Sequence, residues 1–259
     1  MTALLQVLKL SKHFGGLAAV KDLSFEVRQG DIVGLIGPNG AGKTTAFSTI
    51  GGALPATRGR VIFDGVDITG KRPSAIVALG LGRTFQSTVS YADETVARNI
   101  ECALLSRIAG SVPQRLMRRT RALLPAAEVA SEVERIVEIV NLQAWRDVPA
   151  GALAYGLQKK LGIAIALAAR PSMLLMDEPA AGLNHEECNE LTRLLRRLRA
   201  EHGLTVLLVE HHMAIVMEVC HQIVVMVQGE KIAEGSPEEI RANPAVMEAY
   251  LGAPDYAHA

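Results

Sequence analysis

The residues of this sequence whose types and order point most clearly to a chemical function form one short glycine-rich segment. It matches the pattern G-x-x-x-x-G-K-S/T with Gly37, Pro38, Asn39, Gly40, Ala41, Gly42, Lys43 and Thr44. Glycines at this spacing let backbone N–H groups surround phosphate oxygens with no Cβ in the way. The lysine ammonium would reach the outer phosphates, and the threonine hydroxyl is a ligand for Mg²⁺. A chance match is expected in about one chain in a hundred of this length, so the segment predicts a nucleoside triphosphate site.

Two acidic residues further along the chain fit the same chemistry. Residues 173–176 are an apolar run, and Asp177 and Glu178 follow it directly. A carboxylate at the tip of a buried strand can hold Mg²⁺, directly or through water. The next carboxylate is placed to orient and deprotonate an attacking water. Because strands often end in surface acids, this pattern is weak alone, but with the phosphate loop it predicts hydrolysis.

Strands and helices alternate around these residues. Apolar or alternating runs predict strands at residues 5–10, 23–27, 31–36, 60–63, 173–176, 205–209 and 223–227. A helix is expected from Lys43 to about Ile50. Another is expected over residues 186–202, where early acids and late arginines complement the helix dipole. This alternation predicts an α/β fold with a mostly parallel sheet and an N-terminal antiparallel β part.

The middle of the chain has a different pattern. No good strand is predicted between residues 87 and 149, and one segment keeps a helical period through Val129, Val133, Ile136, Val137 and Val140. Residues 107–121 contain five arginines and no acid. We interpret the arginines as a solvated helix face. Contact with a partner or lipid headgroups is a less favoured interpretation, and contact with nucleic acid is less favoured still. The middle segment is predicted to be a helical subdomain inserted into the α/β core.

Composition excludes several classes of protein. Lys+Arg and Asp+Glu number 27 each, so no global charge points to nucleic acid. The N-terminus does not have the pattern of a signal peptide, and no apolar run could span a bilayer, which predicts a cytosolic or peripherally attached protein. The cysteines Cys102, Cys188 and Cys220 are widely spaced, which is typical of reduced thiols rather than a zinc site.

Several further segments together resemble the ATPase subunit of ABC transporters over essentially the whole chain. The resemblance is strongest to the ATPases of branched-chain or hydrophobic amino-acid uptake systems. It rests on residues 14–17 (Phe-Gly-Gly-Leu), 34–45, 83–86 (Arg-Thr-Phe-Gln), 177–184, 210–211 (Glu-His), 243–244 and 248–252. The fold it implies is a P-loop NTPase of ABC type.

The resemblance also implies roles for residues that their own surroundings in the sequence do not identify. Gln86 would touch Mg²⁺ or water in the Q-loop and join the catalytic set with Glu178. His211 would be the switch histidine that contacts the γ-phosphate, and Phe14 would stack on adenine. Thr45 would extend the phosphate loop, and Asn184 would face a second subunit. Without the family, a lone Phe is more often core, and a Gln or His ending a strand is more often structural.

The sequence departs from the family in the signature motif, usually Leu-Ser-Gly-Gly-Gln, which would bind ATP of the opposite subunit. It aligns with Leu153, Ala154, Tyr155, Gly156 and Leu157. Tyr155 at the third position is familiar in this branch of the family, whereas alanine replaces serine and leucine replaces glutamine. A hydrogen bond to a charged group is worth roughly 1.5–3 kcal/mol, so its loss could slow turnover on the order of ten- to a hundredfold. His185 and His212 are smaller departures. Drift at tolerant positions is one interpretation; the other is an asymmetric pair with one impaired ATP site.

These observations predict a single ATPase domain over residues 1–259. Its α/β core would comprise residues 1–86 and 150–235, its helical subdomain residues 87–149, and its C-terminal tail residues 236–259. The resemblance implies that Mg²⁺ and ATP are the ligands. It implies as partners the transmembrane permease subunits and a second ATPase subunit, identical or different, and indirectly an extracytoplasmic solute-binding protein. Nucleic acid is not an expected partner. The chain would lie on the cytoplasmic face of the inner membrane and energise import. By analogy with the family, the imported solutes would be branched-chain amino acids or related small solutes. A hydrolysis-impaired regulatory subunit is the alternative, and a non-transport ABC protein is disfavoured.

Overall fold

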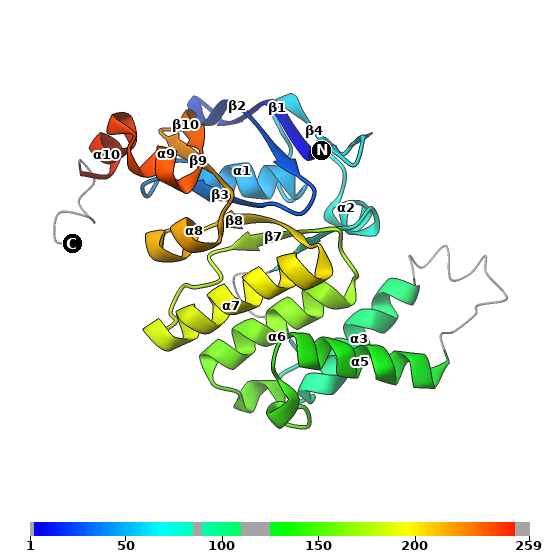
Figure 1. Ribbon diagram of the computed structural model, residues 1–259. Helices are drawn as coiled ribbons and strands as arrows, with labels where there is room; N and C mark the ends of the chain where they lie inside the picture. The colour runs from blue at the N-terminus through cyan, green and yellow to red at the C-terminus, as the bar shows by residue number, and fades with distance from the viewer. Residues whose placement is uncertain (1–2, 85–89, 110–124, 252–259) are drawn as a thin grey trace. The chain divides into compact units, whose positions relative to one another are not determined.

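The computed structural model describes residues 3–84, 90–109 and 125–251, and the chain forms two compact units. One unit comprises Met1–Arg83 and Ser172–Ala259, and the other is Thr84–Pro171. The first contains two β-sheets with helices, and the second is helical (Figure 1).

A six-stranded sheet organises the first unit. Its order is β10(Glu230–Gly235), β9(Gln222–Val227), β3(Ile32–Ile36), β8(Thr205–Val209), β7(Met173–Asp177) and β6(Leu81–Arg83). All neighbouring strands are parallel except β10, which runs antiparallel to β9. Every residue of β3, β7 and β8 is buried, as continuous apolar runs predict for strands covered on both faces. The carboxyl end of β3 leads directly into the glycine-rich loop, and β7 ends at the acidic pair Asp177 and Glu178.

The second sheet of this unit is antiparallel and four-stranded. Its order is β2(Leu17–Arg28), β1(Ala3–Phe14), β4(Arg58–Phe63) and β5(Val66–Asp67). Helix α1(Lys43–Ile50) contacts β1 and β2 on one side and β7 and β8 on the other, so it packs between the two sheets. Its buried Ala46, Phe47 and Ile50 belong to the core that the sheets share.

The remaining helices of this unit are α2(Pro73–Ala78), α7(His185–His202), α8(Met213–Val219), α9(Pro237–Arg241) and α10(Pro244–Leu251). Figure 1 shows α7 on the other side of the six-stranded sheet from α1. Asn184 caps α7 in a reciprocal capping box with Glu187, and Gly203 ends the helix at φ 61°. Acids in its first turn and bases in its last complement its dipole, as the sequence predicts.

The helical unit is built from α3(Val96–Ala109), α5(Ala126–Ile139) and α6(Tyr155–Ala168), with short 3₁₀ turns η1(Gln143–Trp145) and η2(Ala150–Ala152). The three helices contact one another pairwise. The periodic valines and isoleucines predicted as a helix face are buried in α5 and just beyond it. The unit contains the predicted range 87–149 together with α6, and the division of residues 1–259 into functional domains stays a prediction.

The predicted strands are present, and several are longer than predicted. The runs at residues 5–10 and 23–27 become the twelve-residue strands β1 and β2, because the two strands pair with each other well beyond the apolar runs. Strands β5, β6 and β10 were not predicted: the first two have two and three residues, and β10 is mostly exposed. Gln86 and most of the arginine-rich segment 107–121, from residue 110 onward, lie outside the described residues.

Candidate functional site

The glycine-rich loop lies between β3 and α1, and its backbone conformation requires glycine at two positions. Gly37 has φ 151°, and a Cβ there would lie 2.0 Å from the Met226 carbonyl oxygen. Gly42 has φ 96°, and a Cβ there would lie 2.2 Å from the Ala19 carbonyl oxygen. The loop therefore packs against the main chain of β9 and β2, and only glycine permits that approach.

Lys43, the first residue of α1, is held inside the loop. Its side chain is 6% exposed, and Nζ donates hydrogen bonds to the carbonyl oxygens of Gly37 (2.7 Å) and Pro38 (3.1 Å). Burial lowers the pKa of the Lys43 ammonium, and the nearby Glu178 and Asp177 carboxylates oppose that shift. The loop thus positions a cation beside main-chain N–H groups at a helix start, which suits a phosphate.

A cavity of about 810 Å³ opens beside this loop. Its size is in the range of small-molecule sites. The structure brings together three predicted elements there: the loop, the half-exposed Phe14 ring and the carboxylate of Glu178. The lining residues are Phe14, Gly16, Leu17, Ala18, Ala19, Lys21, Asn39, Gly40, Ala41, Gly42, Lys43, Thr44, Thr45, Glu178, Gln228 and Gly229.

Asp177 ends β7 as a buried carboxylate, 5% exposed. Burial raises its pKa. Arg83 and Lys43 oppose that effect, while the carboxylates of Glu178 and Glu210 add to it. A cation would relieve this destabilisation of the charged form. With the exposed Thr44 hydroxyl, the donor set consists of hard oxygens, which Mg²⁺ prefers, so these residues fit the ion.

Sequence reasoning gave Arg83 no part in the site. It ends β6 next to β7, where its Nη2 lies 3.7 Å from Asp177 Oδ2 and its guanidinium lies over the Phe47 ring, 4.7 Å from the centroid. The contact joins residues far apart in the chain, and no local pattern in the sequence indicates it.

Glu178 directly follows β7 in an uncommon backbone conformation. Its φ is 47°, in the left-handed region that non-glycine residues rarely adopt, and its N–H donates to the Val209 carbonyl at 2.8 Å. Such outliers gather at functional sites. Its Oε1 lies 3.8 Å from His211 Nδ1, so the structure brings the predicted catalytic carboxylate and the predicted switch histidine together.

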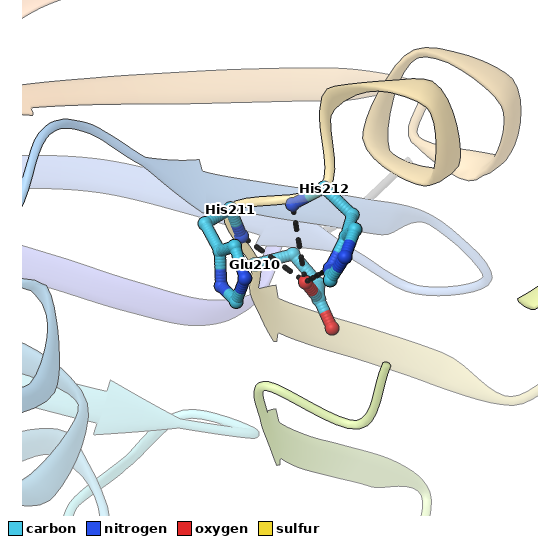
Figure 2. Close-up of side chains that lie close together, drawn as sticks. All are labelled: Glu210, His211 and His212. Carbon is cyan, nitrogen blue, oxygen red and sulfur yellow. Dashed lines mark hydrogen bonds and ion pairs between the residues drawn. The ribbon is translucent and has the colours of Figure 1, made fainter. Parts of the chain in front are cut away.

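Glu210, between β8 and His211, is the second residue that sequence reasoning left without a role. Its carboxylate is completely buried and accepts hydrogen bonds from main-chain N–H groups (Figure 2). The ligand atoms of Glu210, His211 and His212 lie within 4.8 Å of one another, a spacing that could hold a metal ion. However, main-chain N–H groups already occupy both carboxylate oxygens. A charged residue directly after the apolar run of residues 206–209 is the signal that the sequence offers.

The predicted signature residues lie in the helical unit, at the start of α6. Leu153 and Gly156 are buried, and Tyr155 is half exposed with its ring 5.3 Å from Lys159 Nζ. Ala154 is the N-cap of α6, and no side-chain hydrogen bond caps the helix. The structure therefore places these four residues on one helix N-terminus, whose free N–H groups favour an anion.

Comparison with known proteins gives consistent results. The family model described as ABC transporter matches residues 20–181, and one described as branched-chain amino acid ATP-binding cassette transporter matches residues 230–256. The high-affinity branched-chain amino acid transport ATP-binding protein BraF of Pseudomonas aeruginosa is 40% identical over 96% of this chain and 98% of its own length. LivG of Escherichia coli, a protein of the same description, is 38% identical over the same shares. Among solved structures, the ADP conformation of an ATP-binding cassette of an ABC transporter matches with a TM-score of 0.84 and 32% identity, over 97% of this chain and all of that one.

Proposed function

The chain belongs to the ATP-binding subunits of ABC transporters, and on that premise we propose that it hydrolyses Mg-ATP to drive uptake of branched-chain amino acids or related small solutes. One observation supports the activity above others. A single cavity combines the phosphate loop, an exposed aromatic ring and the carboxylate that follows the buried Asp177. The cargo is proposed from the relatives' descriptions, because an ATPase subunit does not itself select the solute.

ATP would lie with its phosphates on the loop and its base toward Phe14. Main-chain N–H groups of residues 39–44 and the Lys43 ammonium would hold the β- and γ-phosphates. The half-exposed Phe14 ring lines the same cavity and offers a face on which the base could stack. Lys43 would exchange its carbonyl partners for phosphate oxygens, which satisfy the buried charge better.

Glu178 is the proposed general base. Its carboxylate lines the cavity, so it can accept a proton from water that attacks the γ-phosphate. His211, 3.8 Å away, would orient that carboxylate or the phosphate. Thr44 and Asp177 are the residues we propose as holding Mg²⁺, which when bound would neutralise charge on the phosphate oxygens. Gln86, which is outside the described residues, completes the proposed set by resemblance.

The proposed assembly follows from family membership. The partners would be transmembrane permease subunits and a second ATPase subunit, with a solute-binding protein acting outside the cell. Among the helices of the described ranges, none combines the length and apolar character that a membrane span requires. We propose that the chain attaches to the cytoplasmic face of the membrane through the permease.

The test is Mg-ATP turnover by the purified chain beside its Glu178→Gln variant. The substitution keeps the size of the side chain but removes the base, so we expect turnover to fall at least a hundredfold while ATP affinity stays within a few-fold. If the wild type hydrolyses ATP and Glu178→Gln hydrolyses it at the same rate, the role of Glu178 is overturned.

A second candidate function is a nucleotide-dependent regulatory subunit that hydrolyses ATP poorly. The uncapped start of α6, where Ala154 stands in place of serine, is the observation that favours it. Tight ATP binding without turnover, both alone and with a partner ATPase, would support this function. Turnover that appears only with the partner would support an asymmetric pair.

A further inference from the structure

Glu210 is an acid in an unusual place. It comes directly after β8, all five residues of which are buried, and its own side chain is 0% exposed. An ionised carboxylate away from water costs several kcal/mol unless partners replace its hydration. Its partners therefore indicate what the residue does.

Each oxygen of the carboxylate serves a different segment of the chain. Oε1 accepts the main-chain N–H of Ala180 at 2.7 Å. Oε2 accepts the N–H groups of His211 at 3.1 Å and His212 at 3.3 Å, and lies 3.4 Å from His212 Nδ1 (Figure 2). Hydrogen bonds to a charged acceptor are roughly twice as strong as neutral ones. One side chain thus bridges two loops that follow neighbouring strands, β7 and β8.

Those loops carry the proposed catalytic residues. Ala180 is two residues after Glu178, which is held at φ 47°, and His211 follows Glu210 directly. The Glu178 carboxylate and the His211 imidazole approach each other to 3.8 Å. If either loop moved by about 1 Å, misplacement of the reacting groups could reduce the rate on the order of a hundredfold.

We propose that Glu210 is a positioning residue that fixes the loop after Glu178 to the segment carrying His211, and so sets the geometry of hydrolysis. The inference rests on the ATPase function proposed above. Glu210 does not line the nucleotide cavity, so it acts through the two loops rather than on ATP. Because both of its oxygens accept hydrogen bonds from main-chain N–H groups, a carboxylate is needed at this position, and another buried polar group would not replace it.

Glu210→Gln tests this with an almost isosteric change. The amide keeps one accepting oxygen, but its NH₂ group must face a main-chain N–H donor, so one loop loses its partner. In the assembled transporter we expect kcat for Mg-ATP to fall at least tenfold, while the Kd for ATP stays within about twofold. The turnover left in Glu178→Gln gives the background from any other ATPase subunit.

A double-mutant cycle separates positioning from a general structural role. If Glu210 acts through His211, then Glu210→Gln should cost much less turnover in a His211→Ala background than in the wild type. The control is His212→Ala, which removes only the imidazole contact and leaves three N–H bonds, and is expected to change kcat less than twofold.

Wild-type kcat in Glu210→Gln, or an equal fold-loss in both backgrounds, would overturn the proposal. If Glu210→Gln does not fold, judged by its melting temperature, then Glu210→Asp decides in the same assays. That variant keeps the charge but withdraws it by one methylene, so it too should lose kcat at constant ATP affinity. Failure of the underlying ATPase function would look different, because the wild type and Glu178→Gln would then have equal turnover.

Discussion

The start of α6 offers a stability prediction, because Ala154 and Leu157, which replace the serine and glutamine of the family signature, lie at its capping positions. Ala154 is the N-cap, with φ −60° and ψ 154°, and its carbonyl already accepts the Gln158 N–H at 3.0 Å. Leu157 is the N3 residue. The usual family pattern, serine at N-cap and glutamine at N3, is that of a capping box. The chain therefore lacks both side chains that would satisfy free N–H groups of this helix.

Ala154→Ser should stabilise the helical unit by about 1 kcal/mol, because the hydroxyl can accept an N–H of the first turn at an exposed site. With a urea m-value of about 1–3 kcal/mol/M, the midpoint should rise by about 0.3–1 M. The chain has one tryptophan, Trp145, and it lies in this same unit, so its fluorescence reports the transition. Adding Leu157→Gln should raise the midpoint further.

The matched control is Ala154→Val, which changes the same position without supplying an acceptor. Its midpoint should not rise, because valine is as poor an N-cap as alanine. If Ala154→Ser and Ala154→Val have the wild-type midpoint, the reasoning about the missing cap is refuted.

Two other features give predictions about stability. Asn184→Ala should lower the free energy of unfolding by about 1 kcal/mol, because it removes the capping box of α7. A urea titration measures this change, with Asn184→Asp as the conservative control. An unchanged midpoint in Asn184→Ala would contradict the prediction. Burial raises the pKa of the Cys220 thiol to about 12, against 9.0 for an exposed thiol. The folded state therefore keeps a proton that the unfolded state releases, so the free energy of unfolding should fall as pH rises from 9 toward 12. Cys220→Ala should fall less steeply in urea titrations across that range, and equal slopes would contradict the assignment.

The parts of the fold that the sequence predicts well are those with strong local patterns. Strands β3, β7 and β8 consist almost entirely of apolar residues and are buried throughout. Strand β10 escapes prediction because its residues are mostly exposed and it is defined by pairing with β9. Helix α9 was missed although Ser236, Pro237 and Glu239 form a capping box with proline at the first turn, a signal that sequence alone contains.

The site divides along the same line. The chemistry of the phosphate loop is local, because contiguous residues determine its glycine conformations and the helix start, and so its residues could be named in advance. The Arg83–Asp177 contact and the bonds of Glu210 to Ala180 depend on which strands become neighbours in the sheet. No spacing along the chain encodes that adjacency, which is why the roles of Arg83 and Glu210 emerge only from the structure.

The intact phosphate loop and the uncapped α6 lie in different compact units, and by family resemblance they would serve different ATP sites of a dimer. This separation makes the asymmetry hypothesis testable within one chain. On the proposed roles, Glu178→Gln would disable the site of this chain's own loop, whereas Ala154→Ser would act on the site that α6 completes. In an assembly with a different ATPase, Ala154→Ser should therefore still raise the turnover that remains in the Glu178→Gln background. In a homodimer both sites carry the Gln substitution, and no rise should occur. If Ala154→Ser changes turnover in neither assembly, the missing hydroxyl does not limit hydrolysis, and the departure at Ala154 affects only the stability of the helix.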